Sequence, residues 1–312
     1  MMDEFMKALS GKLAERWAKM AAPAVVFWAA AVLAWAYAGR GWSRLASITD
    51  WLNNQKAVSQ IAALLGAMVV VAASTILVQR LTTPVLRLLE GYWRPCLGLL
   101  AEGGRLVVQC RKKRRDHAWQ LLQDKLDKEM SLPPNELAKY ARLERRRRHH
   151  PVQDNELLPT RIGNILRAAE TRPVHRYGLD VTRIWPRLWL VLPETARREL
   201  EAARSSLDAS VAAAIWGVAF LGFLPLTWWA FIGLGVAIVT VVWWIPARAE
   251  VFADLTEASV ELYRVALYQQ LRWPVPKTPA DEVERGKELT KYLERGSDDG
   301  AVHFTPSSPA GR

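Results

Sequence analysis

The stretch Ala209 to Ala247 reads ASVAAAIWGVAFLGFLPLTWWAFIGLGVAIVTVVWWIPA and contains no charged residue. At 39 residues it is too long for a single membrane span, which needs about 20. Pro225 interrupts it near the middle, and the pairs Trp228-Trp229 and Trp243-Trp244 follow. Trp favours the lipid–water boundary because its ring is amphipathic. The stretch therefore predicts a membrane hairpin, with helices over residues 209–224 and 229–247 and a turn over 225–228.

A pair of buried core helices in a soluble protein is the competing interpretation of this stretch. A helix at the surface of such a protein keeps a polar face toward solvent. No polar face occurs at any helical spacing within residues 209–247. We therefore expect an integral membrane protein.

Two earlier charge-free runs are each long enough to span, at residues 20–39 and 57–79. The first could instead be a signal peptide, because Ala36-Tyr37-Ala38 resembles a small-residue cleavage site. Its length and the long polar segment before it, residues 1–19, favour a retained helix. The sequence thus predicts four spans, with residues 40–56 as the first external loop.

Basic residues predict the orientation of the spans. Residues 81–208 contain 25 Lys and Arg against 16 Asp and Glu, and the whole chain has a net charge of +11. Arg and Lys concentrate on the cytoplasmic side of membrane proteins. We expect both termini in the cytoplasm, a plasma (inner) membrane location, and a basic cytoplasmic domain over residues 80–208. Arg40, Arg44 and Lys56 argue weakly against this orientation.

This domain is predicted to be all-helical, because no alternation of two residues flanked by hairpin turns occurs in it. Thr160 and Asp180 are suited to cap helix N-termini. Pro193 opens a long helix that leads into the third span. The fold class is therefore all-α, a four-helix transmembrane protein with a helical basic domain between spans two and three. Further cytoplasmic helices over residues 248–295 precede a disordered tail over 296–312.

The helix after the fourth span carries an apolar stripe beside an acidic stripe. An acidic face is repelled by anionic headgroups, so this helix is expected to leave the membrane and pack on protein. We predict that Leu255 and Leu262 pack against the helices of residues 84–130, in the same or a neighbouring subunit. The acidic side chains that we expect to face Arg or Lys of residues 81–208 are Glu250, Asp254, Glu257 and Glu261.

Arginines form the candidate ligand sites. Arg145–Arg148, together with Arg111–Arg115, could bind phosphates of lipid or nucleic acid, or form a solvated surface. No aromatic residue is interleaved with the run to stack on bases, which argues against a nucleic-acid partner. Four further arginines surround a helix end and the next helix start, as an anion site or a structural joint. The candidate anion or headgroup contacts are Arg145, Arg146, Arg147, Arg148, Arg161, Arg167, Arg172 and Arg176.

One face of the second span is mildly polar. Gln60, Ala63, Ala67 and Ser74 fall on this face and could line a pore or pack against another helix. Small residues at this spacing let membrane helices approach closely, so packing is the favoured interpretation.

No motif of the sequence supports an enzyme. No phosphate loop, nucleophile elbow or metal-ligand spacing occurs. No ionisable residue lies within the four predicted spans, and such residues usually mark ion pathways or catalysis. We accordingly predict no catalytic residues, no metal and no cofactor.

The segment LPTRIGNILRAAE, with RYGLD and WPRL after it and LLEGYW at residues 88–93 before it, resembles a signature of uncharacterised bacterial multi-pass membrane proteins. The resemblance covers the cytoplasmic part of the chain and carries no known activity.

These features favour a non-enzymatic, homo-oligomeric membrane protein. It would act as a channel-like pore, or as a membrane-anchored effector or scaffold controlled by its basic domain. The alternatives are a transporter subunit or membrane anchor for an unidentified protein partner and, from another class, a lipid-modifying enzyme.

Overall fold

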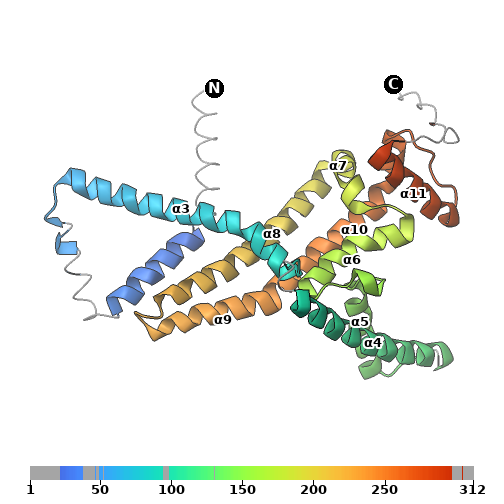
Figure 1. The fold of residues 1–312 in the computed structure, drawn as a ribbon, viewed down its shortest axis with the longest axis horizontal. Coiled ribbons are helices and arrows are strands. Elements are labelled where there is room, and N and C mark those ends of the chain that lie inside the picture. The colour runs from blue at the N-terminus through green and yellow to red at the C-terminus, as the bar shows by residue number, and fades with distance from the viewer. Residues whose placement is uncertain are drawn as a thin grey trace. The chain divides into compact units, whose positions relative to one another are not determined.

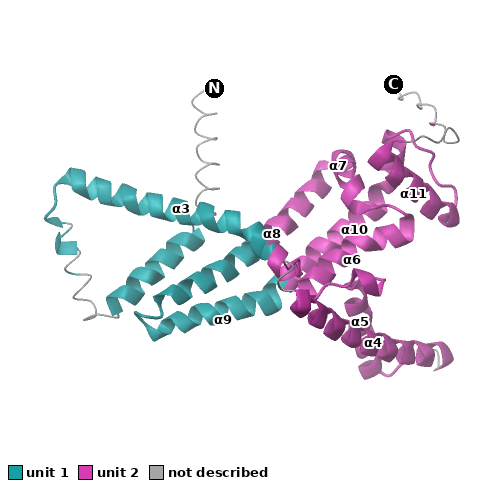
Figure 2. Ribbon diagram, viewed as in Figure 1, with its two compact units in different colours: residues 1–86, 208–245 teal, residues 87–207, 246–312 magenta. Residues whose placement is uncertain are grey.

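The computed structural model describes residues 22–37, 46, 49–51, 53–93, 98–129, 131–296 and 304. Within these residues the chain is all-α and contains no strand, which confirms the predicted class (Figure 1). The described parts form two compact units (Figure 2). Unit 1 comprises residues 1–86 and 208–245, and unit 2 comprises residues 87–207 and 246–312. The predicted N-terminal segment 1–19 and nearly all of the predicted tail lie outside the described residues.

The helices follow one another in a simple order. The long α-helices are α3 (Ala57–Glu90), α4 (Gly98–Glu129), α5 (Pro134–Arg148), α6 (Arg161–Tyr177), α7 (Val181–Val191), α8 (Glu194–Phe220), α9 (Phe231–Val239), α10 (Ile245–Gln270) and α11 (Pro279–Arg295). The short elements are 3-10 turns at Asp154–Glu156, Leu221–Phe223 and Trp228–Ala230, and a π-helical segment at Thr240–Trp244.

Three helical stretches are long and apolar enough to cross a membrane. They are Ala57–Glu90, Glu194–Phe223 and Trp228–Gln270. A shorter apolar helix, Ala22–Tyr37, occupies the place of the first predicted span. By length and composition the described chain thus has three candidate spans, where the sequence predicts four.

The helix Ala22–Tyr37 packs on the other helices of unit 1. The Trp28 indole nitrogen donates a hydrogen bond of 3.1 Å to the hydroxyl of Ser74 in α3. The Phe27 ring lies 4.7 Å from that of Trp216 in α8, centroid to centroid. Tyr37 stacks on Trp229 at 4.9 Å. This helix therefore contacts α3, α8 and the start of the Trp228–Gln270 stretch.

The hairpin of unit 1 turns between Leu221 and Thr227, and the Thr227 hydroxyl accepts a hydrogen bond from the Trp229 amide. Its two helices approach closely at a pair of glycines. A Cβ atom placed on Gly217 would lie 2.7 Å from the Gly233 carbonyl oxygen, and a Cβ on Gly233 would meet the Gly217 carbonyl oxygen. Small residues permit such close approach between apolar helices.

Unit 2 has an apolar core of its own. Side chains from α7, α8, α10 and α11 and from the segments that connect them fill it, and those nearest its centre include Ile184, Leu188, Val260 and Trp273. Residues 246–296 contribute to the same core as residues 87–207. The predicted basic domain and the helices after the hairpin therefore form one structural unit.

The start of α6 is fixed by local hydrogen bonds. Thr160 is its N-cap, as predicted, and accepts a bond from the Gly163 amide. The fully buried Asn164 amide bonds both the N–H and the C=O of Leu158. Gly163 has no room for a side chain, because a Cβ there would clash with the Glu90 carbonyl oxygen.

Several helices contain residues that local rules disfavour at those positions. Pro173 lies inside α6, which continues to Tyr177. Gly103 and Gly104 lie inside α4. The N-cap of α5 is Pro133, although Asn135, of a type that favours N-caps, lies two residues later. Asp180 caps α7 as predicted, accepting a bond from the Thr182 amide. Pro173 removes one helical hydrogen bond and crowds the preceding turn, at a cost of about 3 kcal/mol that the packing around α6 offsets.

The buried face of α10 is not the face that the apolar stripe predicts. In the single chain Leu262 is 72% exposed, and Leu255 packs against the apolar core of unit 2. The buried side chains of α10 include Ala253, Glu257 and Val260. Within one chain Leu262 lacks the predicted contact, because Glu257 of the acidic stripe lies on the buried face of α10 and meets the arginines of α6. Packing of Leu262 on a neighbouring subunit stays a prediction.

Candidate anion-binding site

A cavity of about 360 Å³ lies in unit 2 between α4, α5, the loop that follows α5, and α6. We call it the basic cavity. Its lining has seven Lys and Arg side chains, two carboxylates and two histidines. These residues are Lys112, Arg115, Arg146, Arg147, Arg148, Arg172, Arg176, Asp116, Glu144, His150 and His175.

Four of the seven cations are paired with acids. Lys112 bonds Asp154 at 2.7 Å, and hydrogen bonds from Lys112 and then Gln109 lower the pKa of Asp154. The other three pairs are Arg147 with Asp116, Arg172 with Glu257, and Arg176 with both Glu257 and Glu261. Among the described residues Arg115, Arg146 and Arg148 have no such ion pair. The cavity therefore carries a surplus of positive charge.

His150 is held neutral at the wall of the basic cavity. Its Nδ1 lies 2.8 Å from the Arg146 carbonyl oxygen, and its Nε2 lies 2.8 Å from Nη2 of Arg115. A carbonyl only accepts and a guanidinium only donates, so Nδ1 carries the proton and Nε2 presents its lone pair. Burial, and then the charge of Arg115, lower the pKa of His150 from 6.5 to about 4. The neutral ring thus orients Arg115 without adding charge.

Arg172 links three helices of unit 2. Its guanidinium is buried and lies 3.4 Å from the Glu257 carboxylate of α10. It also donates a hydrogen bond to the carbonyl of Arg148, at the last residue of α5. A cation at a helix C-terminus satisfies carbonyl groups that have no partner within the helix. Arg172 therefore stabilises the wall of the basic cavity. The excess positive charge of the cavity comes from Arg115, Arg146 and Arg148, which have no ion pair among the described residues.

The acidic residues of α10 face basic side chains, as predicted. Glu250 pairs with Arg145 at 3.2 Å and with Arg161 at 2.9 Å. Glu257 and Glu261 pair with Arg172 and Arg176 as described above. Asp254 differs from the prediction, because its partner is His149, at 3.0 Å, and not Arg or Lys.

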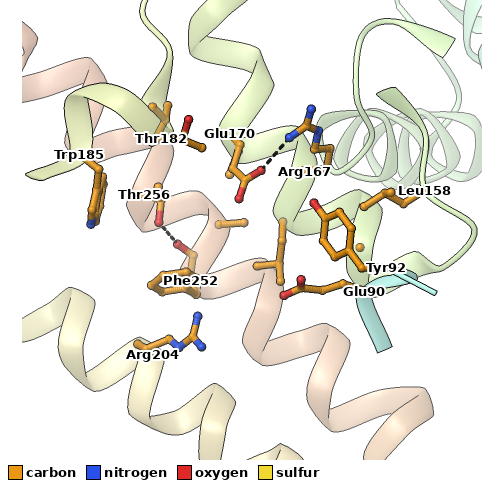
Figure 3. Close-up of a pocket in the computed structure, with 15 residues that line it drawn as sticks. Glu90, Tyr92, Leu158, Arg167, Glu170, Thr182, Trp185, Arg204, Phe252 and Thr256 are labelled. Atoms are coloured by element: carbon orange, nitrogen blue, oxygen red, sulfur yellow. Dashed lines mark hydrogen bonds and ion pairs between the residues drawn. The ribbon is translucent and has the colours of Figure 1, made fainter. Parts of the chain in front are cut away.

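A second cavity of about 300 Å³ in unit 2 has a balanced charge (Figure 3). We call it the mixed cavity. Glu90 and Glu170 line it together with Arg167 and Arg204, and Trp185, Tyr92 and Phe252 supply apolar surface. Arg167 bonds Glu170 at 3.2 Å, as the dashed line in Figure 3 shows. Because its acids and bases are equal in number, this cavity attracts an anion less than the basic cavity does.

The structure divides the predicted site arginines among three places. Arg145 of α5 and Arg161 of α6 pair with Glu250 in the acidic stripe of α10. Arg167 lines the mixed cavity. The basic cavity brings together Arg146, Arg147, Arg148, Arg172 and Arg176.

The polar face predicted on α3 is satisfied within the chain. The Gln60 amide donates to the Gln55 carbonyl at 3.4 Å, and Ser74 receives the bond from Trp28. Ala63 and Ala67 are exposed. The two polar groups of this face are thus used in hydrogen bonds of unit 1.

Comparisons of the chain with protein-family models, with curated proteins and with solved structures found no match. The LPTRIGNILRAAE segment is explained by the fold itself. Thr160 caps α6, Gly163 permits a close approach, and Asn164 bonds the preceding loop. Its pattern therefore describes a structural joint, and the family resemblance stays a hypothesis.

Two features at or beside the basic cavity do not follow from the sequence pattern. The first is that Lys112 and Arg115 line it, because the pattern shows only one basic run over Arg111–Arg115. The second is Trp119, which does not line the cavity but whose ring lies 3.9 Å from the Arg147 guanidinium carbon. The helical spacing of Arg115 and Trp119 places them on one face of α4. Which helix that face meets depends on the fold.

Proposed function

We propose that the chain is a four-span integral membrane protein in which a basic helical domain, unit 2, is anchored at the cytoplasmic surface as an effector or scaffold. The observation that carries this proposal is the division of the chain. The charge-free helices gather in unit 1, while unit 2 has a complete apolar core of its own. A domain that folds around its own core needs the spans only as an anchor.

The helix Ala22–Tyr37, first in the described chain, is proposed as a membrane span in addition to the three candidate spans. Its contacts through Phe27, Trp28 and Tyr37 would be lost if it were cleaved as a signal peptide. Aromatic pairs contribute roughly 0.5–1.5 kcal/mol each beyond the area they bury. A retained helix is therefore favoured over a cleaved one.

An effector or scaffold is favoured over a pore. A passive pore needs polar groups free to face water, whereas Gln60 and Ser74 have hydrogen-bond partners within unit 1. The oligomeric state of the purified protein and ion flux in liposomes distinguish the two. A ring of identical subunits that conducts would contradict the scaffold proposal, and a non-conducting protein would support it.

The proposed topology is tested with single-cysteine reporters. Cys96 and Cys110 are first replaced by Ser, and one cysteine is then introduced at Ser47 or at Gln153. An impermeant thiol reagent applied to intact cells should label the Ser47 reporter and spare the Gln153 reporter. Labelling of both after permeabilisation is the control. Labelling of Gln153 in intact cells would overturn the orientation.

Anionic headgroups are the proposed membrane partner of unit 2. Arg145–Arg148 are exposed and basic, and each basic residue near an anionic leaflet contributes about 1 kcal/mol. Such attraction weakens at high salt. Salt-dependent association of the full chain with anionic lipid is the expected behaviour.

A further inference from the structure

Three guanidinium groups of the basic cavity form no ion pair with any of the described residues. Arg146 and Arg148 lie in the last turn of α5, and Arg115 approaches from α4. Burial lowers the pKa of Arg115, the charge of Asp116 partly opposes this shift, and the like charges of Arg146 and Arg111 lower the pKa further. Like charges held together are costly unless an anion compensates them.

The two carboxylates of the basic cavity offset only part of this charge. Asp116 lies 4.0 Å from the Arg147 guanidinium, which also covers the Trp119 ring, and its charge acts on Arg115 as well. The Oε2 atom of Glu144 is buried and has no hydrogen-bond partner among the described residues. Seven Lys and Arg against two carboxylates in the lining leave an excess of positive charge that an anion from outside the chain would compensate.

The size of the cavity indicates the class of anion. At about 360 Å³ it falls within the range of small-molecule pockets, roughly 300–1,000 Å³. Guanidinium groups match phosphate oxygens in a planar, two-bond geometry. A cavity of this size accommodates a phosphate together with the group that it esterifies.

We propose that the basic cavity binds the phosphate group of a phosphate monoester, with Arg115, Arg146 and Arg148 as its ligands and His150 as the positioning residue of Arg115. The ester is either a soluble metabolite or a lipid headgroup. Only the lipid source rests on the proposed function, because a soluble ester would reach the cavity wherever the chain resides.

The experiment uses the full chain in detergent, with glycerol 3-phosphate as the probe and titration calorimetry as the readout. Arg146→Gln with Arg148→Gln removes two ligands that have no ion pair within the described fold. Arg114→Gln with Arg142→Gln is the matched control, because both arginines are exposed on α4 and α5 and neither lines the cavity. Thermal unfolding of each variant verifies its fold.

We expect the wild type and the control to bind with affinities within about twofold, and the cavity variant to bind at least about tenfold more weakly, since charge-assisted hydrogen bonds are lost. Arg115→Lys, which keeps the charge but not the planar geometry, should also weaken binding. Equal weakening in the cavity variant and the control would indicate a diffuse basic surface and overturn the proposal. Absence of wild-type binding would overturn it as well.

The source of the ester is tested in nanodiscs of phosphatidylcholine with and without phosphatidic acid. If the anionic lipid blocks glycerol 3-phosphate, the cavity takes a headgroup. If it does not, the cavity takes a soluble ester. Either result supports the phosphate site, and neither depends on the labelling experiment that tests the topology.

Discussion

At the scale of single residues, Arg172 and Glu257 illustrate how charge is buried in unit 2. The two side chains are 8% and 10% exposed and come from segments 85 residues apart. Taking charges out of water is costly, so such a pair persists only when each group is bonded. Arg172 meets this condition through Glu257 and the Arg148 carbonyl, and Glu257 through Arg172 and Arg176.

Replacing Arg172 should therefore destabilise the protein strongly. Arg172→Met leaves Glu257 buried with Arg176 as its remaining partner, and we expect a loss of about 3 kcal/mol in the free energy of unfolding. The measurement is chemical unfolding of the detergent-solubilised chain. Arg198→Met, which removes an exposed pair with Glu194 on α8, is the control and should cost at most about 0.5 kcal/mol. Equal effects of the two changes would refute this account.

His150 predicts a pH dependence of stability. Its pKa is about 4 in the fold and 6.5 as the ordinary value, so the unfolded chain takes up this proton more readily. Stability is unaffected by this group above about pH 6.5 and falls as the pH drops toward about 4. His150→Asn keeps a donor and an acceptor but does not titrate. In melting experiments between pH 7.5 and 4 the variant should lose less stability than the wild type. Parallel profiles would contradict the assignment.

At the scale of elements, the glycine pair of the hairpin sets the spacing of α8 and α9. A methyl group on Gly233 would press on the Gly217 carbonyl and on Phe220, whereas one on Gly235 would meet nothing within 4 Å. These two positions in α9 differ by two residues and provide a matched comparison.

We expect Gly233→Ala to lower the stability of the hairpin by about 1–3 kcal/mol, the usual cost of overpacking. Gly235→Ala should be neutral or slightly stabilising. The melting temperature of the protein in detergent, followed by size-exclusion chromatography, measures both. A Gly233→Ala variant as stable as Gly235→Ala would mean that the helices do not approach at this point.

A charged residue should have opposite effects on stability on the two faces of α10. Val260 is fully buried and Leu262 is 72% exposed, although both are aliphatic. Val260→Asp places an unpaired charge in the core and should prevent folding, because several kcal/mol exceed the margin of a typical domain. Leu262→Asp should change stability by at most about 0.5 kcal/mol. Expression level and melting temperature distinguish these outcomes. A severe loss of stability with Leu262→Asp would show that Leu262 is packed, as the apolar stripe in the sequence predicts.

At the scale of the whole molecule, unit 2 is built from two separated segments. Residues 87–207 supply α4 to α7 and the start of α8, while residues 246–296 supply most of α10 and all of α11. Leu267, Tyr268 and Trp273 are among the most buried side chains of the core and belong to the second segment. The basic segment is therefore incomplete without the chain that follows the hairpin.

Truncation after residue 245 should consequently unfold unit 2 and leave the spans intact. The truncated chain is expected to stay in the membrane fraction while residues 87–207 become sensitive to protease. The full chain under the same conditions is the control. Protease resistance of the truncated chain would show that residues 87–207 fold alone.

The sequence alone determined the features that depend on neighbouring residues. The absence of charge over residues 209–247 defined the hairpin, because length and composition decide whether a helix can cross a bilayer. Thr160 and Asp180 were identified as helix caps, because capping involves only the next three residues. The all-α class followed from the same local patterns.

Only the tertiary structure decided which surfaces meet. The apolar stripe of α10 predicted a buried Leu262, yet Glu257 is buried instead, because its partner Arg172 lies on a helix distant in sequence. In the same way, no local pattern shows which of the eight candidate arginines meets an acid. In the structure six of them have a carboxylate partner, whereas Arg146 and Arg148 have none among the described residues. Ion pairing between distant segments depends on the three-dimensional packing, which no local pattern encodes.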